Sequence, residues 1–171
     1  MKMRFFLAAL MVGCTLLALD GCGFRLRGSA GVSVPLPVTY VQGANASGAL
    51  LSELRRALDG AGVKVTEDRE QAQAILTVFN EDKSRRVLSV GGAGTVSEFE
   101  LHYAVTYDVN DQEGKPLQAT QIVSLERAVS FSQADVLAKG AEEDLLYRDM
   151  RRDVIQGILR RLSAMGKAAE K

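Results

Sequence analysis

Residues 98–109 read EFELHYAVTYDV, and their polarity changes at almost every position. A period of two places successive side chains on opposite faces of a β-strand. One face of this strand is therefore buried and the other is wet, which is typical of an antiparallel sheet covered on one side. The apolar face carries Phe99, Leu101, Tyr103, Val105, Tyr107 and Val109.

Further strands are expected on both sides of this stretch. Residues 74–80 are rich in apolar and β-branched side chains, and we expect their strand to continue to Val90 after an interruption at residues 81–84. A strand over residues 117–131 follows a hairpin loop, and Arg127 lies on its apolar face. We therefore expect Arg127 to lie near a rim or to pair with a carboxylate. Shorter strands are expected at residues 38–41 and 63–66, a glycine turn at Gly91–Gly94 and the hairpin loop at residues 110–115.

Two amphipathic helices complete the pattern. Residues 45–62 place leucines at helical spacing, with Ser47 or Asn45 as the cap and the Arg55-Arg56 pair on a solvated face. Residues 142–165 repeat large apolar side chains every four residues. Two apolar helix stripes and one apolar sheet face must cover one another. The sequence predicts an α+β fold: a two-layer sandwich with a mainly antiparallel sheet of about four strands and two helices packed on one face. The open polar face is a plausible docking surface.

Composition removes several classes of function. The chain has 171 residues and a formal net charge of zero, so it has no overall attraction for nucleic acid, and any anion must be met by a local basic patch. His102 is the only histidine, and both cysteines lie in the first 22 residues. These counts argue against zinc sites, a disulfide framework and most catalytic triads. No nucleophile, phosphate-loop or metalloprotease motif is found, so we expect neither an enzyme nor a metal or cofactor.

The first residues are typical of an export signal. Lys2 and Arg4 precede an apolar run that is shorter than the ~20 residues of a membrane-spanning helix. The run ends in Leu-Asp-Gly-Cys at residues 19–22, which resembles the lipobox of bacterial lipoproteins, although Asp20 departs from the small residue usual there. Cys22 would then carry a diacylglycerol and an N-acyl chain, and Gly23 would allow sorting to the outer membrane. The alternative is an ordinary signal peptide cut near Gly21.

Four segments follow from these features. Residues 1–21 are expected to be the signal peptide, and residues 22–37 the lipidated cysteine and a tether rich in Gly, Ser and Pro. Residues 38–166 form the α+β domain, and residues 167–171 are expected to be a flexible tail.

Several stretches, taken in order, resemble the LptE family of lipopolysaccharide-assembly lipoproteins. CGFRLRG at residues 22–28 is similar to the family's mature start, and LSELRRAL at residues 51–58 to its first helix. Residues 98–109 resemble its long central strand. Leu137-Ala138-Lys139, an acidic pair and ILRRL at residues 158–162 resemble its C-terminal segment.

The resemblance implies a function without covalent chemistry. Members of the family plug the lumen of LptD, an outer-membrane β-barrel, assist its folding and bind lipopolysaccharide. Lys139 corresponds to a lysine proposed to contact lipopolysaccharide. The family's basic residue at a hairpin tip has no counterpart in Gly91–Gly94, and Arg85 and Arg86 are expected to compensate. A lysine acts on a phosphate as a point charge with three donors.

Two functions are consistent with the sequence. The first is a lipid-anchored subunit on the periplasmic side of the outer membrane, with an LptD-type barrel and lipopolysaccharide as partners and no nucleic acid. The second is an outer-membrane lipoprotein that binds a small ligand without a barrel partner, which predicts an apolar pocket inside the domain.

Overall fold

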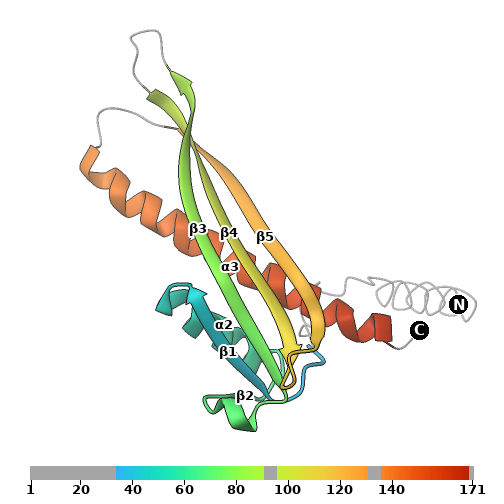
Figure 1. Ribbon diagram of the computed structural model, residues 1–171. Helices are drawn as coiled ribbons and strands as arrows, with labels where there is room; N and C mark the ends of the chain where they lie inside the picture. Colours follow the sequence, from blue (N-terminus) through green and yellow to red (C-terminus); the bar gives the residue numbers. More distant parts are fainter. Residues whose placement is uncertain (1–33, 91–95, 131–135, 170–171) are drawn as a thin grey trace, which may run out of the picture. The chain divides into compact units, whose positions relative to one another are not determined.

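The alternating stretch forms the middle of a long strand in a five-stranded sheet (Figure 1). The computed structural model describes residues 34–90, 96–130 and 136–169, all of which belong to one unit, Val32–Lys171. The predicted signal peptide, Cys22 and the Gly91–Gly94 turn lie outside the described residues.

The α+β class is confirmed, with two helices on a sheet of five strands rather than about four; the long strand pairs are antiparallel, and one edge of the sheet is parallel. Its order is β2-β1-β3-β4-β5, with β1 parallel to both of its neighbours and the other pairs antiparallel. Short strands were expected at residues 38–41 and 63–66, but their local pattern does not show which strands they pair with or in which direction. The strands are β1 Thr39–Asn45, β2 Val65–Thr66, β3 Ala74–Val90, β4 Val96–Asp111 and β5 Pro116–Ser130, with a short 3-10 helix, η2, at Arg69–Gln71 between β2 and β3.

Strand β3 runs without the interruption predicted at residues 81–84. Those polar residues pair with β4 in regular order, and the irregularity is a register shift between Val78 and Asn80. One extra residue moves the following side chains to the other face of a sheet. Before the shift, the even-numbered Leu76 and Val78 face the helices. After the shift, the odd-numbered Glu81, which lies opposite Val105, faces them instead.

Two helices cover the apolar face of the sheet (Figure 1). Helix α2, Gly48–Gly60, begins where the Ser47 Oγ accepts a hydrogen bond from Leu50 N at 3.1 Å. Helix α3, Val136–Ala169, starts six residues before the predicted Glu142, because the acidic residues taken as its first turn lie in its second. It extends to Ala169, three residues into the segment predicted as a tail.

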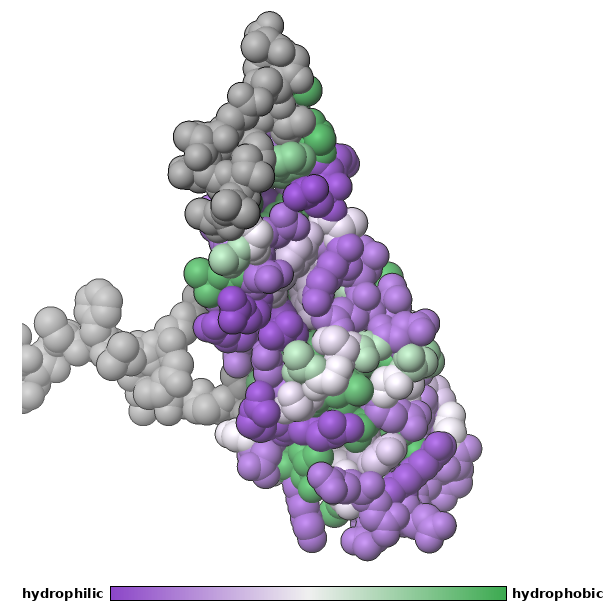
Figure 2. Space-filling view, turned by 90° about the vertical axis from the view of Figure 1, so that its left-hand side faces the viewer, coloured by the Kyte–Doolittle hydropathy of each residue, from purple (hydrophilic) through white to green (hydrophobic). Residues whose placement is uncertain are grey.

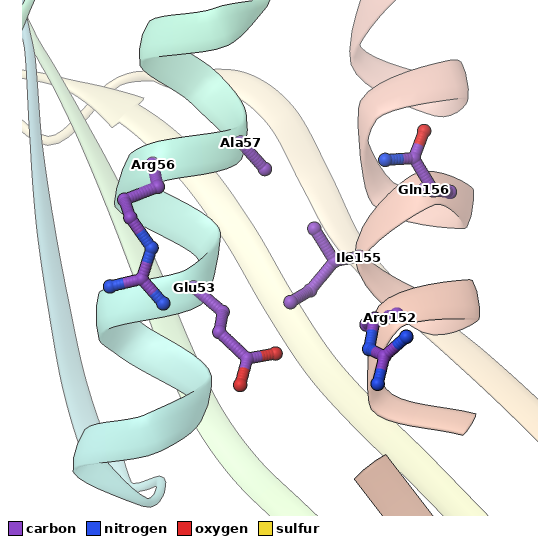
Figure 3. A pocket seen from close by; sticks show the side chains of 6 residues that line it. All are labelled: Glu53, Arg56, Ala57, Arg152, Ile155 and Gln156. Carbon is purple, nitrogen blue, oxygen red and sulfur yellow. The ribbon is translucent and has the colours of Figure 1, made fainter. Parts of the chain in front are cut away.

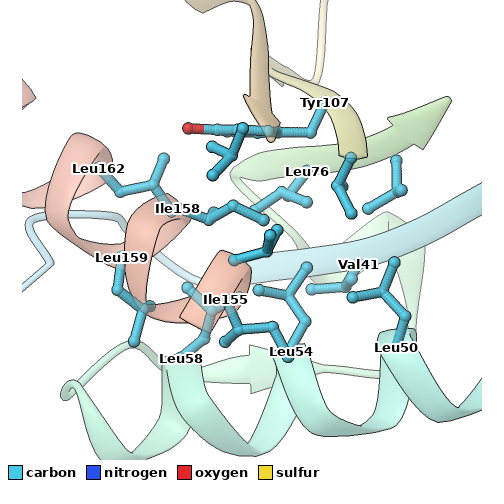
Figure 4. Close-up of a cluster of buried hydrophobic side chains, with 14 of the residues drawn as sticks. Val41, Leu50, Leu54, Leu58, Leu76, Tyr107, Ile155, Ile158, Leu159 and Leu162 are labelled. Carbon is cyan, nitrogen blue, oxygen red and sulfur yellow. The ribbon is translucent and has the colours of Figure 1, made fainter. Parts of the chain in front are cut away.

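The hydrophobic core lies between the helices and the sheet. Leu50, Leu54 and Leu58 of α2 are fully buried, and burying one such side chain stabilises the fold by roughly 1.5–3 kcal/mol. Figure 4 shows them against side chains of α3 and the sheet. Gly157 allows α3 to approach the sheet, because a Cβ at this position would lie 2.9 Å from Val123 Cγ1. The other large members of the core include Tyr103, Tyr107, Met150, Ile158 and Leu162.

Candidate functional site

The long strands continue past the core into a charged segment, which we call the sheet end: residues 83–90 of β3, 98–100 of β4 and 128–130 of β5. Exposed apolar side chains also occur here, at Val87, Leu88 and Val90. Figure 2 shows hydrophobic residues beside the grey ones at this end, above a mostly hydrophilic surface. Both charged and apolar groups are thus accessible to a partner or ligand.

Arg85 lies on the helix-facing side of the sheet end. Its Nη1 donates to Glu143 Oε2 of α3 at 2.9 Å, and its guanidinium lies 4.6 Å from the centre of the Phe99 ring. Nearby, the Tyr147 hydroxyl donates to the Ser84 carbonyl at 2.8 Å. These polar contacts link α3 to this part of the sheet, beside the partly buried apolar side chains Val129 and Leu146.

Arg86 lies on the opposite face, because neighbouring residues of a strand alternate. Its Nη2 donates to Glu100 Oε1 at 2.5 Å. Farther along this face, His102 lies between Asp82, at 3.8 Å, and Glu126, at 3.6 Å. The open face therefore carries basic and acidic side chains from three strands. Arg85 and Arg86 consequently cannot hold one ligand group together.

Lys139 belongs to the first turns of α3, and its side chain lies outside the described residues. It precedes Glu143 by four residues, one helical turn of about 6 Å along the axis. Since Glu143 binds Arg85, the backbone at Lys139 lies at the same end of the molecule and on the same side of the sheet as Arg85. The structure brings two of the three predicted contact residues to one place.

A buried carboxylate joins the core to the sheet end. The Glu81 side chain is 5% exposed and accepts hydrogen bonds from Ser47 N at 2.6 Å and from the Tyr103 hydroxyl at 2.7 Å. Burial raises the pKa of Glu81, but these hydrogen bonds and the nearby Lys83 outweigh it, so its pKa lies below the ordinary 4.5. Burial, and then the Glu81 acceptor, raises the pKa of Tyr103. Sequence reasoning missed this group because the predicted interruption of β3 covered it.

A second charged cluster joins the two helices. Arg151, only 8% exposed, donates to both carboxylate oxygens of Glu53, at 3.1 and 2.8 Å. The hydrogen bonds from Arg151 lower the pKa of Glu53 against an opposing effect of burial, and the charges of Arg56 and Arg152 lower it further. The carboxylate therefore stays ionised.

The structure also shows the surroundings of Arg127 and Arg55. Arg127 pairs with Asp153 at 2.6 Å, as expected. Arg55 was expected on a solvated face, but it is half-buried and donates to the Val41 carbonyl at 2.8 Å.

An open groove of about 470 Å³ lies beside this cluster, between α2 and α3 (Figure 3). It is not an apolar pocket inside the domain, since charged side chains line it. Its lining residues are Glu53, Arg56, Ala57, Arg152, Ile155 and Gln156.

The described part of the chain contains neither a candidate metal site nor a candidate membrane-spanning helix. No group of three or more His, Cys, Asp and Glu side chains is placed to hold a metal ion there. None of the described helices combines the length and apolar character needed to cross a membrane.

Comparison with known proteins gives a consistent result. The family model LptE, described as lipopolysaccharide-assembly, matches residues 32–162. The LPS-assembly lipoprotein LptE of Pectobacterium atrosepticum is 27% identical over 171 residues, covering 98% of this chain and 91% of the relative. The protein of the same name from Photorhabdus laumondii is 26% identical and covers 97% and 90%.

Solved structures agree with the fold. Lipoprotein B of Nitrosomonas europaea superposes with a TM-score of 0.72 at 35% identity, covering 85% of this chain and 94% of that one. The rare lipoprotein B of Shewanella oneidensis gives a TM-score of 0.67 at 23% identity, covering 78% and 98%. The second likeness supports the fold alone.

Proposed function

Because this chain belongs to the LptE family of lipopolysaccharide-assembly proteins, we propose that it is an outer-membrane lipoprotein that plugs an LptD-type β-barrel and helps deliver lipopolysaccharide to the outer leaflet. One observation carries this proposal. The family model spans residues 32–162, and two curated relatives named for this task align with nearly the whole chain. We propose that the protein assists assembly by binding and performs no covalent chemistry.

We propose a lipid anchor at Cys22, on the periplasmic side of the outer membrane. The relatives are named lipoproteins, and their alignments extend over at least 97% of this chain. Two or more acyl chains are needed for stable anchoring, which a fully modified cysteine provides. In fractionated cells, Cys22→Ser should move the protein from the membrane to the soluble fraction. Retention of the variant in the membrane would argue against lipidation at this residue.

The plug role is supported by the face of the sheet that the helices leave open. This face carries charges of both signs, including Arg86, Glu100 and Glu126. The interior of outer-membrane barrels is polar, so such a surface is suited to contact with a lumen wall. Co-expression with an affinity-tagged LptD-type barrel, followed by detergent extraction, tests this role. We expect the chain to co-purify with the barrel, and a barrel recovered without it would contradict the proposal.

We propose that Arg85 and Lys139 contact the phosphates of lipopolysaccharide from the helix-facing side of the sheet end, with Arg86 contributing from the other face. The Arg85–Glu143 pair is partly exposed, at 49% and 33% for the two side chains. Exposed ion pairs contribute little to stability, roughly 0–1 kcal/mol. A phosphate can therefore replace Glu143 as the partner of Arg85 at small cost.

The alternative function, a small-ligand lipoprotein without a barrel, predicts an apolar pocket inside the domain. The groove between α2 and α3 is open and lined by charged side chains, so it does not favour this alternative.

A further inference from the structure

The groove between α2 and α3 has a chemistry that the lipopolysaccharide contacts do not use. We infer that it is a docking site for an acidic segment of the barrel, whose carboxylates bind between Arg56 and Arg152. The inference rests on the proposed function, because the barrel is the partner that function supplies. The groove residues are separate from the sheet end, where the proposed lipopolysaccharide contacts lie.

The two walls of the groove are equivalent turns of the two helices. Helix α2 contributes Glu53, Arg56 and Ala57, and α3 contributes Arg152, Ile155 and Gln156, so each wall has residues at i, i+3 and i+4. Residues at this spacing share one face of a helix. The small Ala57 side chain leaves room opposite Ile155, and Figure 3 shows the side chains of both helices around this space.

The groove has unused positive charge. Its one carboxylate, Glu53, is already bound through both oxygens by the buried Arg151. Within the described residues, no carboxylate lies within ion-pair distance of Arg56. The ion pair that Arg152 makes within the described part of the chain is with its helix neighbour Asp149, at 3.2 Å, and the Arg152 side chain is 66% exposed. Such a pair is weak and can be exchanged for a partner's carboxylate.

The use of arginine instead of lysine on the two helix segments also supports a protein partner. Helix α2 and residues 148–161 of α3 contain seven arginines and no lysine, although the whole chain has seven lysines and fourteen arginines. Arginine binds carboxylates through two parallel hydrogen bonds and is enriched at protein interfaces, whereas lysine is depleted there. A surface that only has to be hydrated could carry lysine as well as arginine. The seven are Arg55, Arg56, Arg148, Arg151, Arg152, Arg160 and Arg161.

The occupant is a protein segment rather than an anionic lipid. A lipid headgroup site needs apolar surface beside it for the acyl chains, and the groove offers only Ala57 and Ile155. The exposed large apolar side chains Val87, Leu88 and Val90 belong to the sheet end instead. Gln156 adds a neutral amide that can donate to a peptide carbonyl.

The test uses the full lipidated chain co-expressed with an affinity-tagged LptD-type barrel. The variant Arg56→Gln/Arg152→Gln removes both cations that line the groove. We expect about tenfold weaker retention on the barrel, with most of the salt dependence of binding lost. The matched control, Lys64→Gln/Arg69→Gln, removes two cations from exposed residues outside the groove, and it should behave like the unaltered chain. Thermal unfolding of each variant should match that of the unaltered protein.

A second measurement covers the case in which the double variant folds poorly. A photo-crosslinking amino acid at Gln156 should label a barrel peptide that contains Asp or Glu. Labelling of a peptide without acidic residues would overturn the inference.

The possible results distinguish failure of the groove inference from failure of the proposed function. Equal retention of the double variant and the unaltered chain would overturn the groove inference and leave the proposed function intact. Failure of the unaltered chain to bind the barrel would remove both. Equal loss in the control would show that total charge acts rather than the groove. Arg56- and Arg152-dependent binding to phosphatidylglycerol vesicles, with barrel binding unchanged, would assign the groove to lipid and overturn the inference.

Discussion

The core region and the sheet end belong to the same long strands but have opposite surroundings. In the core region, Leu54 of α2 and Ile158 of α3 are fully buried against the strands. At the sheet end, Val87 and Val90 of β3 are 46% and 58% exposed, and partly exposed charged pairs lie on both faces of the sheet. Along one sheet, the core region therefore provides stability and the sheet end provides groups for recognition. Substitutions in the core region should change stability, whereas those at the sheet end should change binding.

The largest contrast compares truncations in the two regions. Leu54→Ala removes fully buried methyl groups and should lower the free energy of unfolding by about 2–5 kcal/mol. Val87→Ala, in a half-exposed position, should change it by about 0.5 kcal/mol or less. Urea titration of both variants measures the difference. Similar losses would break the distinction between the two regions.

A second contrast compares two glycines of α3. Alanine at Gly157 places a Cβ 2.9 Å from Val123 Cγ1, and such overpacking costs about 1–3 kcal/mol, partly offset by alanine's better helix propensity of up to about 1 kcal/mol. Among the described residues, no atom lies within 4 Å of a Cβ built at Gly140. Gly157→Ala should therefore lower the melting temperature and Gly140→Ala should raise it. A higher melting temperature for Gly157→Ala would show that the helix and the sheet are not tightly packed there.

A third prediction concerns Glu81, which connects the two regions. At neutral pH, Glu81→Gln should cost about 1–2 kcal/mol, because the hydrogen bonds from Ser47 and Tyr103 lose a charged acceptor. The folded pKa of Glu81 lies below its ordinary 4.5, so the contribution of the carboxylate is fully present above that value. It is lost as the pH falls through the folded pKa. Urea titrations at decreasing pH should show the gap between the two proteins closing below 4.5, and a constant gap would contradict this role.

The smallest effect on stability is expected at the sheet end. Arg85→Glu and Lys139→Glu should each weaken lipopolysaccharide binding about tenfold, since a cation is replaced by an anion near the phosphates. The melting temperature should change little, because Arg85 pairs at the surface. Arg86→Glu is the informative control, since Arg86 lies on the other face and should have a smaller effect. Unchanged binding in the first two variants would remove the proposed contacts.

The parts of the fold with strong periodicity could be predicted from the sequence. Residues 98–109 form a strand because one side chain in two enters the core, and the Ser47 cap follows from local chemistry. The pairing of Arg127 with a carboxylate was also expected, and Asp153 provides it. The strand and the cap depend on short segments, and the need of Arg127 for a carboxylate follows from its place on an apolar strand face, although the sequence does not identify Asp153 as the partner.

Features that depend on distant partners were missed. The polar residues 81–84 continue β3 because β4 pairs with them and because Glu81 finds Ser47 and Tyr103. Neither partner is visible from the local pattern. The placement of Arg85 and Lys139 on one side of the sheet likewise depends on where α3 crosses the strands. The sequence shows that α2 and residues 148–161 of α3 carry arginine and no lysine, but only the packing of the two helices shows that Arg56 and Arg152 line one groove.

The most direct measurement is the amount of lipopolysaccharide at the surface of cells depleted of this protein. The account predicts that surface lipopolysaccharide falls on depletion and returns with the unaltered chain, while a chain carrying Arg85→Glu and Lys139→Glu restores less at equal abundance. Normal surface lipopolysaccharide after complete depletion would contradict the proposed role in its assembly.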